Sequence, residues 1–255
     1  MKYHIKLSGE MIRGAKIAIL PGDPGRVEKT AKAMNTNAVF LASNREYTSW
    51  LSEVGGNKIL VCSTGIGGPS LSIALEELAS IGIEYFIRIG TTGAIQPYIN
   101  IPSLIITTGA VRLDGASKHY APIEYPAVGD IDVINSLIEG AKRTGVPYYK
   151  GITASSDTFY PGQERYDTFS GYVIKEFQGS LEQWQKLNVL NFEMESATLY
   201  TMASAFGLKA GCIASVIVNR TTKETPDDSV LAAAEKNLAD AVKYAVTELI
   251  KEGGN

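Results

Sequence analysis

Short apolar runs alternate along the chain with segments whose hydrophobic residues have helical spacing. Between residues 71 and 78 the apolar positions follow i, i+3, i+4, i+7, which indicates a helix with one buried face. Similar spacing over 199–206 and 238–249 predicts two further helices. The apolar runs predict strands at residues 16–20, 38–43, 46–54, 58–63, 84–90, 103–112, 148–155, 189–193 and 210–218. Strands and helices that alternate in this way predict an α/β fold.

The alternation continues along the whole chain without a linker, a low-complexity tract or a fixed-period repeat. We therefore predict one domain spanning 1–255, built as a three-layer αβα sandwich with a central mixed β-sheet. Gly55, Gly56 and Asn57 would join two of the strands as a hairpin. Ligands of such sheets bind beyond the carboxyl ends of the strands, so the loops there are the places to search. These loops follow Leu20, Ser63, Ile89, Ser155, Asn191 and Val218.

Length and charge narrow the class of protein. The 255 residues carry 24 Lys and Arg against 27 Asp and Glu, a net charge of −3. This balance argues against a protein that works by coating nucleic acid or an anionic membrane surface. No apolar stretch reaches the ~18 residues of a membrane span, and the N-terminal segment lacks the hydrophobic centre of a secretory signal. Cys62 and Cys212 lie in apolar runs, so we expect reduced core thiols and a cytoplasmic location.

Two loops carry an arginine next to glycines. Gly22 and Arg26 follow the first predicted strand, and between them Asp23 and Pro24 are typical of a helix start. A helix start offers free N–H groups to an anion, although a simple turn with a surface arginine explains these residues equally well. Arg88 lies in an apolar strand that ends in two threonines and two glycines. A buried arginine needs an anionic partner, either an internal carboxylate or, as we prefer, a bound phosphate or carboxylate.

Two further strand ends carry acids, an amide and an aromatic ring. Glu193 and Glu195 are two residues apart and would share one face, which suits sugar hydroxyls, a metal or acid–base chemistry. Glu195 could instead be an early helix residue favoured by the helix dipole. In another loop Phe159 can stack on a flat ring, while Gln163 and Arg165 can meet its carbonyl and N–H groups. The alternative for that loop is a set of solvated polar residues.

Several competing signatures are absent from the sequence. It contains no complete dinucleotide-binding fingerprint, no GxxxxGK[ST] phosphate loop and no GxSxG nucleophile motif. The paired acids have no His/Cys/Asp cluster beside them, so a transition-metal site is not expected. The residues by themselves favour an anion site beside a sugar site and a flat-ring site.

Segments along nearly the whole chain resemble the nucleoside phosphorylase-I family, and within it the members that cleave uridine. They are 21–29 (PGDPGRVEK), 43–50 (SNREYTSW), 62–70 (CSTGIGGPS), 88–97 (RIGTTGAIQP), 111–127 (VRLDGASKHYAPIEYPA), 154–168 (ASSDTFYPGQERYDT) and 191–199 (NFEMESATL). The GQER sequence separates these members from their purine-cleaving relatives. The resemblance implies phosphorolysis of uridine to uracil and ribose 1-phosphate, with inorganic phosphate as co-substrate and no cofactor required.

The resemblance also implies roles for individual residues. It implies a phosphate site at Gly22, Arg26, Arg45, Arg88 and Thr91, a ribose site at His4, Glu193, Met194 and Glu195, and a base site at Thr92, Gly93, Phe159, Gln163, Arg165 and Arg220. His4 and Arg45 would each reach the site of a neighbouring subunit, which implies an obligate dimer, and the family commonly forms a hexamer of three dimers. A structural K⁺ is implied at the dimer interface, at Glu46, Ile66 and Ser70.

Two features of the family bear on specificity and closure. Purine-cleaving members have an aspartate near the position of Asn219, and the family has a mobile flap where this chain has 223–233. The alternatives are a relative that hydrolyses or phosphorolyses purine nucleosides, and a protein that binds nucleoside or phosphate without catalysis.

Overall fold

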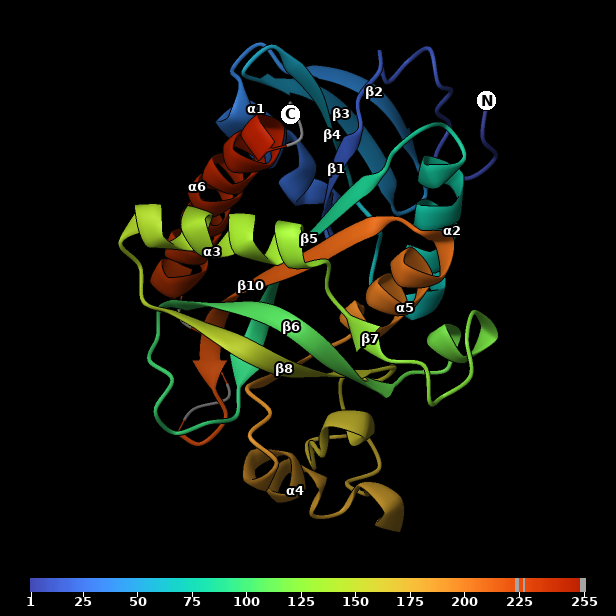
Figure 1. The fold of residues 1–255 in the computed structure, drawn as a ribbon. Coiled ribbons are helices and arrows are strands. Elements are labelled where there is room, and N and C mark those ends of the chain that lie inside the picture. Colours follow the sequence, from blue (N-terminus) through green and yellow to red (C-terminus); the bar gives the residue numbers. More distant parts are fainter. Residues whose placement is uncertain (223–224, 227, 253–255) are drawn as a thin grey trace.

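The computed structural model describes residues 1–222, 225–226 and 228–252. Within that part of the chain ten strands form one mixed sheet with helices on both faces (Figure 1). The strands are β1 (Ile17–Pro21), β2 (Val39–Asn44), β3 (Tyr47–Val54), β4 (Asn57–Cys62), β5 (Tyr85–Ala94), β6 (Ser103–Leu113), β7 (Ala127–Val128), β8 (Tyr148–Ser156), β9 (Asn191–Glu193) and β10 (Lys209–Asn219). The helices are α1 (Val27–Met34), α2 (Gly68–Ala79), α3 (Ile131–Thr144), α4 (Ser180–Lys186), α5 (Ser196–Phe206) and α6 (Asp228–Glu252).

The sheet has two parts that share β5. One part runs in the order β5-β1-β4-β3-β2, with parallel pairing from β5 to β4 and antiparallel pairing beyond. In the other part β5 pairs with both β9 and β10, and β8 and β6 complete the path between them. The strands β5, β9, β8, β6 and β10 therefore form a closed five-strand ring. The predicted mixed sheet is confirmed, whereas the closure of the ring was not predicted.

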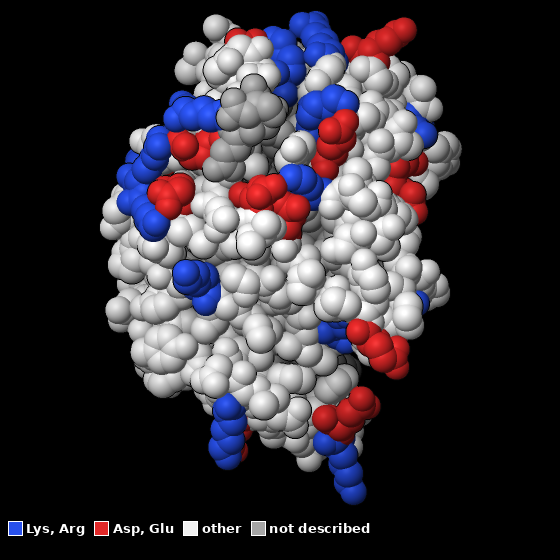
Figure 2. All heavy atoms as spheres, in the orientation of Figure 1, with Lys and Arg blue, Asp and Glu red and all other residues white. Residues whose placement is uncertain are grey.

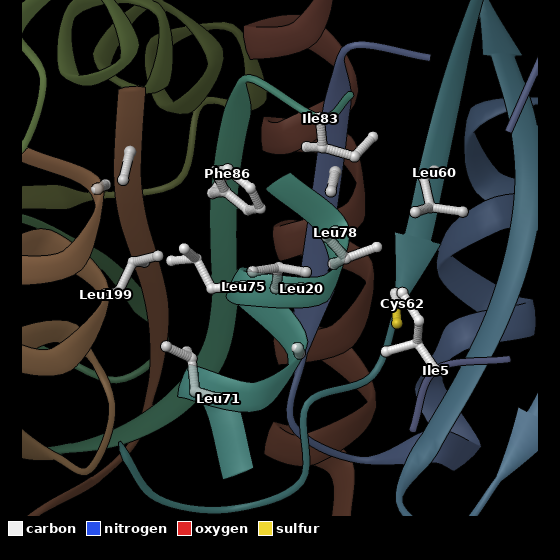
Figure 3. Close-up of a cluster of buried hydrophobic side chains, with 14 of the residues drawn as sticks. Ile5, Leu20, Leu60, Cys62, Leu71, Leu75, Leu78, Ile83, Phe86 and Leu199 are labelled. Carbon is white, nitrogen blue, oxygen red and sulfur yellow. The ribbon is translucent and has the colours of Figure 1, made fainter. Parts of the chain in front are cut away.

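Side chains of β1 alternate between two cores, because successive residues of a strand point to opposite faces of the sheet. Leu20 packs in the core that includes α2 and α5, whereas Ile19 packs in the core that includes α1, α3 and α6. Figure 3 shows the first core, with Leu71, Leu75 and Leu78 of α2 close to Leu20. Helices thus cover both faces, and the predicted three-layer arrangement is confirmed.

The predicted strands are all present, with ends shifted by a few residues. The β3–β4 hairpin has the predicted glycine turn, and Cys62 and Cys212 are free and buried. No residue range was predicted for the two-residue strand β7 or for helices α3 and α4. In Figure 1 α4 lies in a segment that extends from the end of β8 away from the sheet.

Charged side chains of both signs are interspersed on the surface. On the face in Figure 2, Lys and Arg lie among Asp and Glu in the upper part, and most of the lower part carries neither. That face presents no continuous basic surface of the kind that binds nucleic acid. Among the described residues, no helix is both long enough and apolar enough to cross a membrane.

Candidate active site

A cavity of ≈ 640 Å³ lies at the carboxyl ends of β1, β5, β9 and β10. The register brings these ends together, because Leu20 pairs with Arg88 and Val218 pairs with Gly93. A β-bulge between Val216 and Val218 bends β10 at the cavity wall. The lining includes the predicted residues Gly22, Arg26, Ile66, Arg88, Thr91, Thr92, Gly93, Phe159, Gln163, Arg165, Glu193, Met194 and Glu195. The expectation that these strand ends meet at one site is confirmed.

Arg88 is buried in the cavity wall and has an internal carboxylate as its partner. Its Nη2 donates to Glu195 Oε2 at 2.7 Å, and its Nη1 donates to the Leu20 carbonyl at 3.0 Å. Burial alone would lower the pKa of Arg88, but the Glu195 carboxylate opposes this and raises the pKa overall. The internal carboxylate that we left open as a partner of Arg88 is therefore present as Glu195, and binding of an anion by the same guanidinium stays a prediction.

Gly22 lies directly over the Arg88 guanidinium. A Cβ at this position would approach Arg88 Nη2 and the Gly65 carbonyl to 3.1 Å each, which is tighter than ordinary contact. Glycine therefore lets the backbone after β1 approach the buried cation closely. The cationic guanidinium and the backbone together form the end of the cavity where we expected an anion.

Arg26 borders the same cavity from the turn that precedes α1. Asp23 caps this turn, because its side chain accepts a hydrogen bond from the Gly25 N–H at 2.8 Å, as the sequence predicted. The Arg26 Nε lies 3.3 Å from Glu235 Oε1 on α6, and Lys29 Nζ contacts the other oxygen of Glu235 at 3.2 Å. Arg26 is thus more than a solvated surface arginine, and its present partner is an acid from the last helix.

Glu193 and Glu195 have different partners. Glu193 Oε2 accepts hydrogen bonds from the backbone N–H groups of Glu195 and Ser196, at 2.8 and 2.9 Å, so this carboxylate caps the start of α5. Burial and the neighbouring Glu195 raise the pKa of Glu193. Glu195 Oε1 accepts from the Gly67 N–H at 2.7 Å, while its Oε2 holds Arg88. We left open that the Glu195 carboxylate stabilises the start of a helix. In the structure the Glu193 carboxylate does so, at the start of α5.

The far end of the cavity combines aromatic and cationic side chains. Gln163 is buried there, and the Arg165 guanidinium lies 4.3 Å from the centre of the Phe159 ring. Burial lowers the pKa of Arg165. Arg220 Nη1 donates to the Gln163 carbonyl at 2.7 Å, and burial followed by the charge of Arg165 lowers the pKa of Arg220 to about 10. Arg220 is not among the residues that line the cavity, but its guanidinium also lies 5.6 Å from the centre of the Phe192 ring, which does line it.

His4 and Arg45 lie outside this cavity. His4 Nδ1 lies 2.7 Å from Glu77 Oε1, and the His4 carbonyl accepts from Asn44 Nδ2 at 2.7 Å. Arg45 follows Asn44 at the exposed turn between β2 and β3, with a left-handed φ of 54°. The two predicted partner-reaching residues therefore lie near each other, away from the site of their own chain.

The predicted K⁺ residues are brought together only in part. Ser70 Oγ donates to Glu46 Oε1 at 2.7 Å, and hydrogen bonds from the Glu46 backbone and from Ser70 lower the pKa of Glu46. Ile66 is 75% exposed and can offer a cation only its backbone carbonyl. Carboxylate, hydroxyl and carbonyl oxygens are the donors that hard cations prefer, so the donor chemistry fits the ion.

Some residues at or near the site were not predicted from the sequence. Gly67 binds Glu195 through its backbone with φ of 91°, and its signal was the glycine-rich stretch within 62–70. Glu235 had no distinguishing signal. Asn219 does not line the cavity. Its side-chain Nδ2 donates to the carbonyls of Gln96 and Ile99. Of the predicted flap 223–233, residues 223–224 and 227 lie outside the described residues, and 228–233 begin α6.

The phosphorylase superfamily matches residues 16–251 of the chain. This match includes every strand of the sheet and the whole cavity lining. The chain belongs to the phosphorylase superfamily.

Relatives within the phosphorylase superfamily are similar over almost the full length. The uridine phosphorylase of Haemophilus influenzae is 54% identical over 248 residues, covering 97% of this chain and 98% of the relative. The uridine phosphorylase of Escherichia coli strain K12 is also 54% identical, with the same coverage. The guanosine phosphorylase of Halorubrum lacusprofundi is 35% identical over 241 residues, covering 92% of this chain and 94% of the relative.

Proposed function

We propose that the protein is a uridine phosphorylase, a pentosyltransferase that converts uridine and phosphate reversibly into uracil and ribose 1-phosphate. The observation that carries the proposal is a single cavity lined by Arg26 and Arg88, by Glu193 and Glu195, and by the Phe159–Arg165 pair. The 54% identity to uridine phosphorylases over nearly the full length supports the same conclusion. Pyrimidine nucleoside salvage and catabolism is the corresponding cellular role.

The chemistry needs positioning and charge more than a protein nucleophile. Phosphate attacks C1′ of the ribose, the C1′–N1 bond breaks, and its electron pair leaves with the uracil. Holding two reactants in line can supply about 7–11 kcal/mol of the barrier. The forked guanidinium groups of Arg26 and Arg88 match phosphate oxygens, and the Gly22 backbone and Thr91 complete this end of the site.

The other two ends of the cavity serve the sugar and the base. Glu195 with Met194 and Glu193 would hold the ribose hydroxyls, because a carboxylate accepts the hydrogen bonds that hydroxyls donate. Gln163 and Arg165 would donate to the uracil oxygens, where negative charge collects as the glycosidic bond breaks. Thr92, Gly93 and Phe159 would border the base, and Arg220 would act by holding the Gln163 backbone.

We infer that the site is completed by a second copy of the chain. His4 and Arg45 lie away from their own cavity, as expected of residues that serve a neighbour's ribose and phosphate sites. A dimer with two such shared sites is the minimal assembly, and a hexamer of three dimers is the larger one that we expect. K⁺ between Glu46, Ser70 and the Ile66 carbonyl would be structural. The cytoplasmic location remains a prediction.

A spectrophotometric assay of uracil release from uridine, with and without phosphate, tests the proposed reaction. We expect release only when phosphate is present, and inosine and guanosine to be poor substrates. Equal release without phosphate would indicate hydrolysis, and preference for inosine or guanosine would indicate a purine enzyme. Binding of uridine in phosphate without any uracil release would indicate a binding protein and overturn the proposal.

A further inference from the structure

A chain of buried polar side chains crosses the five-strand ring and ends at the cavity wall. Thr92 Oγ1 on β5 donates to the Phe192 carbonyl on β9 at 2.6 Å, and both residues line the cavity. Asn191 Nδ2 donates to Thr92 Oγ1 at 2.8 Å, and Thr153 Oγ1 on β8 donates to Asn191 Oδ1 at 2.8 Å. Thr107 Oγ1 on β6 lies 2.7 Å from Thr153 Oγ1.

The direction of every hydrogen bond in this chain follows from proton counting. Each threonine hydroxyl has one proton, and Thr92 uses its proton on the Phe192 carbonyl. The amide of Asn191 must therefore present its NH₂ group to Thr92 and its oxygen to Thr153. Thr153 in turn donates its proton to Asn191 Oδ1, so Thr107 must be the donor in the hydrogen bond to Thr153. The chain runs one way, from β6 to the cavity.

Because these side chains are buried, each of their polar groups needs a hydrogen-bond partner within the protein. Thr107, Thr153 and Asn191 are fully buried, and Thr92 is 4% exposed. A buried polar group that loses its partner has no water to replace it, so a break at one position leaves its neighbours unsatisfied. Strand β9 has only three residues and pairs with β5 through Gly93–Phe192 and Ala94–Asn191. It also pairs with β8 through Thr153–Asn191, Ala154–Phe192 and Ser155–Glu193, so the side-chain network adds to backbone pairing on both edges of this short strand.

We propose that Asn191 is a positioning residue that sets the base and ribose subsites relative to each other. It does not line the cavity, but it fixes Thr92 on the base side and adjoins Phe192, which precedes Glu193, Met194 and Glu195. Within the described part of the chain, the side chains of Arg26 and Arg88 at the phosphate end make no hydrogen bond to Thr92, Asn191 or Thr153, and they connect with this half of the site through Glu195, which binds Arg88. This inference rests on the proposed function, because it assigns Asn191 to the uridine half of that site.

The test is Asn191→Asp, because aspartate keeps the shape and loses the donor to Thr92. Above its pKa the buried carboxylate cannot donate, whereas the protonated acid can donate to Thr92 and still accept from Thr153. We expect kcat/KM for uridine to fall about ten- to a hundred-fold at the alkaline end of the pH profile, where the introduced carboxyl has lost its proton. The KM for phosphate should stay within about two-fold, and the ratio of variant to unsubstituted activity should recover as the pH falls and the carboxyl is protonated.

Two further variants make the result decisive. Thr153→Val removes the donor to Asn191 and leaves the bond to Thr92, so we expect a smaller loss for uridine and again no change for phosphate. Thr201→Val is the matched control, because the Thr201 hydroxyl is buried on α5 with no hydrogen-bond partner among the described residues. Its kinetics should equal those of the unsubstituted protein.

The possible failures are distinguishable. If the unsubstituted protein released no uracil in phosphate, the proposed function would fail, and the inference with it. If that protein is active but Thr153→Val and Asn191→Asp change the KM of phosphate as much as that of uridine, the positioning role is wrong. A pH-independent loss in Asn191→Asp, or unchanged uridine kinetics in the folded variants, would contradict it equally.

Discussion

The guanidinium of Arg26 and the carboxylate of Glu235 form an ion pair, with Nε 3.3 Å from Oε1, that joins the turn after β1 to α6. Arg26 also lines the cavity in which we place phosphate. The Glu235 carboxylate therefore pairs with a guanidinium that the proposed reaction needs for binding phosphate. The same residue contacts Lys29, so two cationic groups near the phosphate end converge on one acid.

Replacing Glu235 with glutamine should strengthen phosphate binding. The substitution removes a negative charge that competes with phosphate for Arg26. Partly exposed ion pairs are worth about 0.2–1 kcal/mol, so we expect the KM of phosphate to fall by up to about five-fold. Steady-state kinetics at saturating uridine would measure this, with Glu248→Gln as control, because Glu248 lies on the same helix as Glu235 and pairs with Arg143 of α3. A raised or unchanged KM in Glu235→Gln alone would show that the pair does not oppose phosphate binding.

Replacing Arg88 with alanine should abolish most activity and reduce stability. The change removes a preorganised cation, a loss of at least about 3 kcal/mol in transition-state stabilisation. It also leaves Glu195 buried without its cation, which costs about 3–5 kcal/mol of unfolding free energy. Uridine turnover and denaturant unfolding would measure the two effects, with Arg88→Lys as the charge-preserving comparison. Near-normal phosphorolysis by Arg88→Ala would contradict the assignment.

Mixed dimers should recover activity from two inactive variants. If Arg45 serves the partner's site and Arg88 serves its own, Arg45→Ala and Arg88→Ala chains complement each other in one of the two sites of a mixed dimer. Co-expression should give about a quarter of normal activity, because half of the dimers are mixed and each has one intact site. Activity no higher than that of the separate variants would mean that Arg45 does not act across subunits.

Glu164 should be important for uridine affinity although it is not predicted to touch uridine. Its backbone is left-handed, with φ of 51°, and its carboxylate accepts hydrogen bonds from the N–H groups of Gly179 and Leu181 at the start of α4. This docks the loop that carries Gln163 and Arg165. Hydrogen bonds to a charged group are worth about 1.5–3 kcal/mol, so Glu164→Ala should raise the KM of uridine at least about ten-fold.

The control for this prediction is Glu182→Ala. Glu182 is an exposed acid on α4 that pairs with Lys186, so its loss should leave uridine kinetics unchanged. The KM of phosphate should be the same in both variants. Equal effects on both substrates in Glu164→Ala would indicate general loss of structure.

Cys62 should make the protein less stable at alkaline pH. Burial raises the pKa of its thiol to about 11, so the folded state keeps the proton after the unfolded state has lost it. The contribution of the Cys62 thiol to the free energy of unfolding, about 3 kcal/mol in total, is fully present below about pH 8.5. It is lost as the pH rises toward 11. Unfolding free energies measured across this range should fall less steeply for Cys62→Ala. Identical slopes would contradict the shifted pKa.

The sequence predicted the layers and most of the cavity because both leave local signals. Arg88 in an apolar strand, and acids beside Asn191, are conspicuous where the polar pattern breaks. Glu235 is an ordinary glutamate on an amphipathic helix, and only the packing of α6 against α1 reveals its partner. The five-strand ring depends on pairing between strands far apart in sequence, which apolar runs do not encode. The direction of the Asn191 hydrogen bonds likewise appears only when β5, β8 and β9 meet.

The closed ring has a consequence for how the protein accommodates its ligands. Every ring strand is hydrogen-bonded to a neighbour on each side, so none can slide or splay without breaking bonds with two others. Thr92 and Phe192 therefore behave as fixed points of the pocket. Entry and exit of a nucleoside must be accommodated by the parts attached outside that frame, namely the turn that bears Arg26 and the loop that bears Phe159 and Gln163.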